Sequence, residues 1–148
     1  QKTAYEIRLS LVGSEMCIRD RQYLDTPRGD AGMREGIEYL MKAMPADVNN
    51  VSARDADIYY WYYATLALFE HQGEAWKEWN EALVPQLLGN QHTTGAKAGS
   101  WDPQDEWSKM GGRLYQTAIC TLSLEVYYRY KPAGVSEEAR RTGPASDR

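Results

Sequence analysis

The sequence predicts an all-α protein of two helical hairpins, and three observations support this fold class. Apolar residues recur at three- and four-residue spacing over 33–44 and 75–91, as on the buried face of a helix. The segments 58–69 and 114–128 carry almost no charge and are too long for ordinary strands. One-striped helices therefore alternate with helices that are apolar all round. Such alternation is typical of an outer and an inner layer, as in an α/α toroid or a short helical solenoid.

The first predicted hairpin pairs a one-striped helix with an uncharged one. Met33, Ile37 and Leu40 share one face of the first helix, which Pro45 ends. Asp57 is placed to cap the second helix, in which residues 58–69 include no charged side chain. Because a helix that is apolar all round is buried on more than one side, we expect this helix in the inner layer.

The second predicted hairpin repeats this order. Its first helix carries a stripe of large apolar residues: Trp76, Trp79, Leu83 and Leu87. We expect Pro85 to kink that helix, because proline cannot donate to the carbonyl four residues earlier. A loop rich in Gly, Thr and Asp is expected over 90–112, before a nearly uncharged helix that Pro132 ends.

The two uncharged helices also repeat each other in sequence. Tyr63 and Thr65 in the first correspond to Tyr115 and Thr117 in the second. The resulting period of about 50 residues indicates stacked supersecondary units.

Composition excludes several classes of protein. The chain has 148 residues, of which 43% are hydrophobic, and a formal net charge of −4. The mean hydropathy of −0.66 argues against a membrane-embedded protein, and no apolar run approaches the length of a transmembrane helix. Mild acidity without a basic block argues against nucleic acid as a partner. The two cysteines, Cys17 and Cys120, are too few for a disulfide framework or a cysteine-rich metal site. They therefore do not indicate whether the protein works in an oxidising or a reducing compartment.

The first 21 residues share no pattern with the rest of the chain. Residues 2–21 resemble a string that recurs at the ends of proteins translated from assembled environmental DNA, where library adapter is read as coding sequence. The alternative is a genuine strand or helix that carries Ile7, Leu9 and Leu11. We therefore predict that residues 1–21 are an artefact segment outside the fold.

The remaining chain divides into a folded part and a tail. Residues 22–132 hold the two predicted hairpins, and residues 133–148, which are charged and small, are expected to form a disordered tail. Two hairpins cannot close a ring, so their inner helices would expose apolar flanks. We expect the chain to be a C-terminal fragment, with the remainder of its own full-length protein as a partner.

The second loop and the last helix carry a family resemblance. Gln91 at a helix end, followed by Gly99 and Trp101, resembles a loose QW repeat of squalene and hopene cyclases, with a longer gap between Gln and Gly. In that family the Gln bonds a helix terminus and the Trp stacks beside it, which ties neighbouring hairpins together. The segment 57–131, with YYWYYATLAL, GSWDP and GGRLYQTAICTLSLEVYYRY in this order, resembles bacterial members of the prenyltransferase and squalene oxidase repeat superfamily. The resemblance implies an (α/α)6-type toroid, incomplete in this chain.

The catalytic motifs of the resembled enzymes do not match this chain. Triterpene cyclases use an acid from a DxDD motif, whereas the acidic cluster over 102–106 has a different spacing. We interpret that cluster as a solvated turn, with a divalent-ion site as the alternative. In protein prenyltransferases a zinc-binding His stands where this chain has Gln116, and an amide is a poor zinc ligand. We therefore predict no metal site and no cofactor, and interpret His71 and His92 as helix-end and loop residues.

Four residues are candidates for lining an apolar cavity: Tyr59, Tyr63, Tyr115 and Gln116. The ring faces of the tyrosines could stabilise a carbocation. The alternative is that the tyrosines are core residues at a wet edge, since their hydroxyl groups need hydrogen-bond partners. Cys120 is expected to act as a small hydrophobe on a buried face.

Two functional hypotheses follow. In the first, which we favour, the chain is a non-catalytic part of a toroid that has a structural role or binds an isoprenoid or another apolar small molecule. In the second, it belongs to a terpene cyclase or prenyltransferase-type enzyme whose catalytic residues lie in an N-terminal portion outside this chain. The sequence assigns neither catalytic residues nor a cellular compartment.

Overall fold

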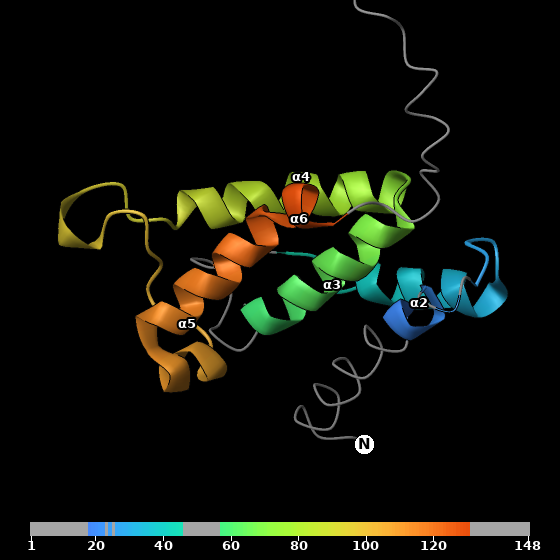
Figure 1. The fold of residues 1–148 in the computed structure, drawn as a ribbon, viewed down its shortest axis with the longest axis horizontal. Coiled ribbons are helices and arrows are strands. Elements are labelled where there is room, and N and C mark those ends of the chain that lie inside the picture. The colour runs from blue at the N-terminus through green and yellow to red at the C-terminus, as the bar shows by residue number, and fades with distance from the viewer. Residues whose placement is uncertain (1–17, 23, 25, 46–56, 131–148) are drawn as a thin grey trace, which may run out of the picture.

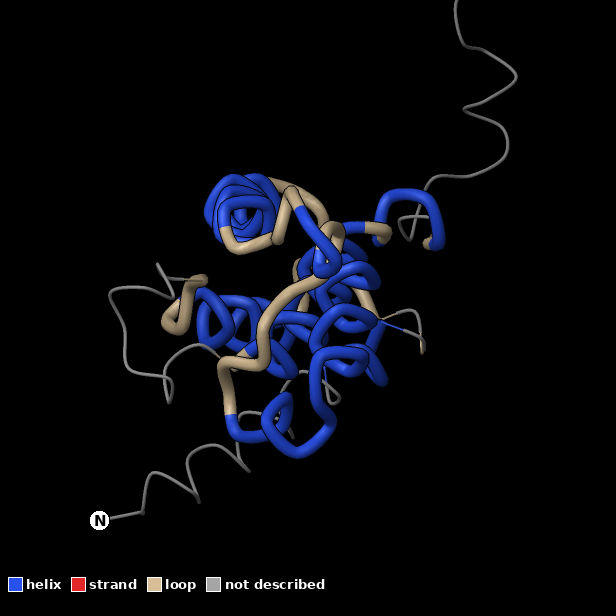
Figure 2. Tube along the Cα trace, turned by 90° about the vertical axis from the view of Figure 1, so that its left-hand side faces the viewer, coloured by secondary structure: helices blue, strands red, loops and turns tan. Residues whose placement is uncertain are grey.

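The computed structural model describes residues 18–22, 24, 26–45 and 57–130. These residues form helices and loops, and no strand occurs among them (Figures 1 and 2), which confirms the all-α prediction. The elements in chain order are α2 (Ala31–Met41), α3 (Ile58–His71), α4 (Glu74–Gly89), the 3-10 turn η1 (Gly95–Lys97), α5 (Glu106–Leu124) and α6 (Val126–Arg129). Residues 18–22 are helical as well. Within the described ranges, no helix combines the length and the apolarity that crossing a membrane requires.

Helix α3 lies at the centre of the described fold, with α2, α4 and α5 around it (Figure 1). Asp57 begins the helix by accepting a hydrogen bond from the backbone N–H of Tyr60 at 3.0 Å, as predicted. Nine of the 14 residues of α3 are buried, including Trp61 and Leu68. Full burial of one such side chain stabilises the fold by about 1.5–3 kcal/mol. The helix packs most extensively on α5 and α4, so the prediction that it is buried on more than one side is confirmed.

Helices α3 and α4 form a tight hairpin. Only Gln72 and Gly73 connect them, and both adopt positive φ, of 62° and 81°. The buried residues of α4 are the four predicted for its apolar stripe: Trp76, Trp79, Leu83 and Leu87. The indole N–H of Trp79 donates to the Thr65 hydroxyl oxygen at 2.9 Å, which joins the two helices through a buried polar contact. The helix continues through Pro85 and ends at Gly89.

Helix α2 packs against α4 and lies next to α3. The Asp30 side chain accepts from the backbone N–H of Met33 at 3.1 Å, and the three predicted stripe residues Met33, Ile37 and Leu40 are buried. The Tyr60 hydroxyl donates to the Leu40 carbonyl at 2.9 Å, which links α3 to the end of α2.

Part of the segment 1–21 lies within the described residues. Ile18 is buried and packs over Gly36, where an added Cβ would meet the Ile18 Cγ1 at 2.8 Å. The side chain of Gln22 donates to the Ala67 carbonyl at 2.9 Å. Residues 1–17 and 133–148 are outside the described part of the chain, so their assignment as an artefact segment and a tail stays a prediction.

Helix α5 begins earlier than the sequence predicts. The predicted loop over 90–112 ends at Asp105, whose side chain accepts from the backbone N–H of Ser108 at 2.7 Å and completes a capping box. A kink then interrupts the helix at Gly112, which has a φ of 72° that favours glycine. Next to it, a Cβ at Gly111 would come within 2.6 Å of the Tyr115 Cβ. The predicted loop boundary at Gly112 is therefore a bend between two helical pieces.

Beyond the kink, α5 presents one buried face to the core. The buried residues follow helical spacing: Gln116, Ile119, Cys120 and Ser123. The opposite side is open, since Leu114 is 83% exposed. An exposed apolar flank is thus present on α5, whereas α3 is enclosed over most of its surface.

Candidate apolar-ligand site

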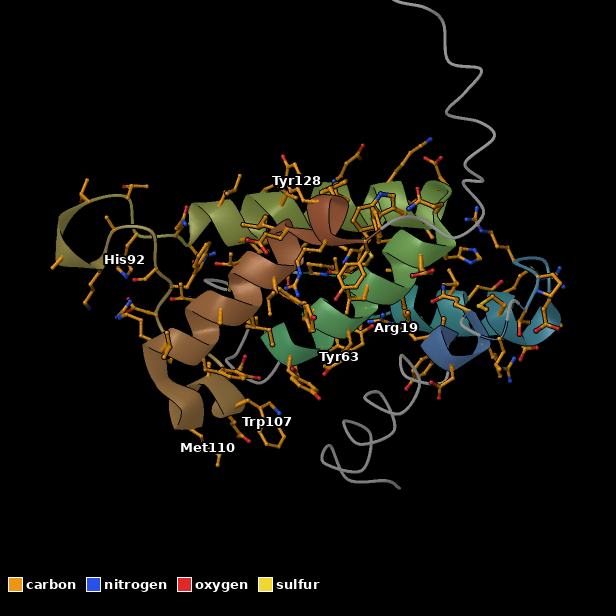
Figure 3. The ribbon with its side chains drawn as sticks, in the orientation of Figure 1. Arg19, Tyr63, His92, Trp107, Met110 and Tyr128 are labelled. Carbon is orange, nitrogen blue, oxygen red and sulfur yellow. The ribbon has the colours of Figure 1, made fainter. Side chains whose placement is uncertain are left out.

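Aromatic rings gather where the N-terminal ends of α3 and α5 lie side by side. The ring centroids of Tyr59 and Tyr63, one turn apart on α3, are 4.7 Å apart. Trp107, in the first turn of α5, brings its ring to 6.4 Å from that of Tyr59. We call Tyr59, Tyr63, Trp107 and Tyr115 the aromatic cluster. Figure 3 shows Tyr63, Trp107 and Met110 on one side of the molecule, away from Tyr128.

The outer edge of the aromatic cluster is apolar and open to solvent. Trp107 is 52% and Met110 84% exposed, and Leu114, farther along α5, is 83% exposed. All three come from the stretch of α5 around the Gly112 kink, which turns the first helical piece of α5 away from the direction of the second. The tyrosines of the cluster are half-buried behind this edge. A concentration of apolar surface of this kind is a common mark of a binding site.

Tyr115 is held next to the kink by the close approach of Gly111. Burial raises the pKa of its phenol, and the carboxylates of Asp105 and Asp57 raise it further. Their negative field disfavours a second negative charge at this phenol.

The Asp105 carboxylate connects the starts of the two helices. One oxygen accepts from the Ser108 backbone N–H, and the other accepts from the backbone N–H of Ile58 at 3.2 Å. Asp105 is fully buried, so the interpretation of the acidic cluster as a solvated turn is wrong for this residue. Two helix N-termini point their N–H groups at one carboxylate, which offsets the cost of burying it. The spacing of Asp105 and Ser108 resembles a capping box and was the available signal for this role.

Gln116 lies on the buried face of α5, with only 1% of its surface exposed. Its amide nitrogen is 3.7 Å from the Cys120 Sγ, and its carbonyl oxygen Oε1 has no hydrogen-bond partner among the described residues. Burial raises the pKa of the Cys120 thiol to about 12, and the nearby Asp105 adds to this shift. Cys120 is thus a protonated, buried side chain, in line with the expected small hydrophobe.

The QW-like residues tie α4 to α5. The indole N–H of Trp101 donates to the Leu87 carbonyl at 2.6 Å, near the end of α4, and its backbone N–H donates to the Thr117 hydroxyl at 3.3 Å. The Gln91 side chain donates to the Gly99 carbonyl at 3.2 Å, within the loop. The Trp rather than the Gln therefore bonds the helix terminus in this chain.

The two histidines lie where the sequence places them, and neither belongs to the aromatic cluster. His71 ends α3, and burial, followed by the charge of Arg28, lowers its pKa. His92 lies in the loop after α4, and its Nε2 is 2.7 Å from Oδ2 of Asp102. Arg113 contacts the other carboxylate oxygen of Asp102. Among the described residues, no group of three or more His, Cys, Asp or Glu side chains has the arrangement of a metal site.

Comparison of the chain with protein-family models, with curated proteins and with solved structures finds no match. The geometry of the aromatic cluster is therefore the basis for the function proposed below.

Proposed function

We propose that this chain binds an apolar small molecule of the isoprenoid class at the aromatic cluster, as a non-catalytic part of a helical repeat protein. The single observation that carries the proposal is the open apolar edge of the cluster, where Trp107 is 52% and Met110 84% exposed. These side chains leave apolar surface in contact with water. An apolar ligand that buried this surface would gain about 25 cal/mol of binding free energy per Å².

The arrangement of half-buried rings behind an exposed edge supports a ligand site over a purely structural role. Tyr59 and Tyr63 supply ring faces at 4.7 Å from each other, inclined by 59°, so that they do not stack flat. Rigid aromatic side chains provide contact area at a small cost in conformational entropy. The rings therefore form a preorganised wall for an apolar ligand.

We further propose that the hairpins are a piece of an α/α toroid of the squalene cyclase and prenyltransferase repeat type. The correspondence of Thr65 and Thr117 supports this, since both hydroxyls accept a hydrogen bond from the following segment, from the indole N–H of Trp79 and from the backbone N–H of Trp101 respectively.

Equilibrium dialysis with radiolabelled farnesol tests the ligand proposal on the full chain. We expect Trp107→Ala to weaken farnesol binding about tenfold, which corresponds to roughly 1.4 kcal/mol of lost contact. Tyr128→Ala is the matched control, because Tyr128 is 90% exposed and lies on the opposite side of the molecule (Figure 3). No saturable farnesol binding, or equal loss in both variants, would overturn the proposal.

A further inference from the structure

The sulfur-containing side chains of the described residues differ greatly in their exposure to solvent. Met110 is 84% exposed, whereas Met33 is 1% exposed. Met41 and Met44 are partly buried and pack against the core. Cys120 is fully buried, and because burial raises the pKa of its thiol to about 12, it stays in the protonated form that reacts slowly with oxidants. Within the described part of the chain, Met110 therefore carries the sulfur that is most open to a dissolved oxidant.

The backbone after Met110 explains why its side chain is open. Gly111 and Gly112 carry no side chains, and the chain bends at Gly112, where φ is 72°. A larger residue at Gly111 would require its surroundings to move, because an added Cβ would come within 2.6 Å of the Tyr115 Cβ. The exposure of the Met110 thioether is thus a consequence of the kink in α5.

Met110 belongs to the open edge of the aromatic cluster. It lies three residues after Trp107 on the first helical piece of α5, so the two side chains are neighbours on that helix. The Trp107 ring is in turn 6.4 Å from the ring of Tyr59. Figure 3 shows Met110 and Trp107 on the same side of the molecule as Tyr63. A change in the polarity of Met110 therefore acts on the surface that we propose receives an apolar ligand.

Peroxides convert an accessible thioether into a sulfoxide. The sulfur donates an electron pair to one peroxide oxygen, an S–O bond forms and the O–O bond breaks. The proton of the transferred oxygen passes to the departing oxygen, which leaves as water or as an alcohol, so the sulfur is oxidised and the peroxide is reduced. The sulfoxide is polar and accepts hydrogen bonds from water. An apolar ligand that covered it would remove this water without replacing the hydrogen bonds, which is unfavourable.

We infer that Met110 is a site of oxidation by peroxides, and that its sulfoxide weakens the binding of an apolar ligand at the aromatic cluster. The inference rests on the proposed function, because it assigns a means of regulation to the same site. The thioether leaves the edge of the cluster apolar, and the sulfoxide makes it polar. Since sulfoxide reductases return methionine sulfoxide to the thioether, the change is reversible.

Mild treatment of the full chain with hydrogen peroxide, followed by peptide mapping with mass spectrometry, tests the modification. We expect Met110 to be oxidised at least about tenfold faster than the buried Met33, because susceptibility follows exposure. Equilibrium dialysis with radiolabelled farnesol then compares each treated chain with its own untreated sample. The oxidised parent chain should bind farnesol about tenfold more weakly. Treatment with sulfoxide reductases for both sulfoxide epimers should restore the binding.

Two variants assign the effect to this one side chain. Met110→Leu keeps an apolar side chain of similar volume that peroxide does not oxidise, and it retains every other methionine of the chain. Peroxide should change its farnesol affinity by less than about twofold. Met110→Gln introduces a polar side chain of similar length and, without peroxide, should bind farnesol at least about fivefold more weakly than Met110→Leu.

The outcomes separate this inference from the proposed function. Oxidation of Met110 no faster than that of Met33 overturns the inference. Farnesol binding that survives complete oxidation of Met110, or that falls equally in Met110→Leu, also overturns it and leaves the proposed function intact. If the untreated parent chain does not bind farnesol, the proposed function and the effect on binding both fail, and preferential oxidation of Met110 in the peptide map then supports the modification site alone.

Discussion

Helices α3 and α5 have similar sequences and different environments. Helix α3 and the part of α5 from Leu114 onward are nearly uncharged, and they share the Tyr-x-Thr pattern that begins at Tyr63 and Tyr115. Helix α3 has neighbours on several sides, whereas α5 buries one face and leaves Leu114 in solvent. Apolar composition thus indicates how much surface a helix is able to bury, and the number of neighbours determines how much of it is buried.

The largest expected effect is a difference in the free energy of unfolding between two leucine variants, one on each helix. Leu68→Ala removes a fully buried side chain of α3 and should lower the free energy of unfolding by about 2–5 kcal/mol. Leu114→Ala removes a side chain that is 83% exposed on α5 and should change it by less than about 0.5 kcal/mol. Urea denaturation of both variants measures the difference. Similar losses would show that the two helices are equally enclosed in solution.

The caps at the starts of the two helices give the next largest effect. Asp105→Ala removes an acceptor for N–H groups of both helices and should cost about 2–3 kcal/mol. Asp57→Ala removes the cap of α3, which accepts from Tyr60, and should cost about 1 kcal/mol. The midpoints of urea denaturation measure both losses, provided that the m-value is the same for the two variants. A smaller loss for Asp105→Ala than for Asp57→Ala would contradict the double role of Asp105.

The repeated threonines provide a finer comparison. Thr65→Val leaves the buried indole N–H of Trp79 without its acceptor, which should cost about 1–3 kcal/mol. Thr117→Val removes a longer hydrogen bond, at 3.3 Å from the partly buried backbone N–H of Trp101, and should cost about 0.5–1 kcal/mol. Thermal and urea unfolding of the two valine variants measure both values. The reverse order would mean that the α5 copy of the repeat carries more of the stability.

The last comparison concerns pH and the buried face of α5. Because the folded-state pKa of Cys120 is raised to about 12, the folded chain holds the thiol proton more tightly than the unfolded chain. The corresponding stability is fully present below the unfolded pKa of about 8.5 and is lost as the pH rises towards the folded pKa. Between pH 8 and pH 10, the parent chain should lose about 1–2 kcal/mol more stability than Cys120→Ala. Identical pH dependence would show that the thiol is exposed to solvent.

The sequence predicts the enclosed helix better than the open one. Local signals were sufficient for α3, because Asp57 and an uncharged run together define its start and its burial. For α5, the two glycines before Arg113 resemble the end of a loop, whereas the capping box of Asp105 and Ser108 begins a first helical piece before them and the chain bends at Gly112.

The candidate site was predictable only where local sequence signals mark its residues. Tyr59, Tyr63 and Tyr115 stand out in the sequence as aromatic residues on uncharged helices, and the structure leaves all three half-buried. Trp107 lies in a stretch that reads as loop, and its contact with Tyr59 spans 48 positions of sequence, which no local pattern encodes. The double role of Asp105 likewise depends on α3 and α5 lying side by side.

Hydroxyl-radical footprinting with mass spectrometry tests most directly the claim that α3 is enclosed while the edge of α5 is open. The account predicts rapid oxidation of Trp107 and Met110, which are 52% and 84% exposed, and strong protection of Trp61 and Trp79, at 2% and 0%. Protection of Trp107 and Met110 to the level of Trp79 would contradict it, because the aromatic cluster would then be covered and unable to receive a ligand.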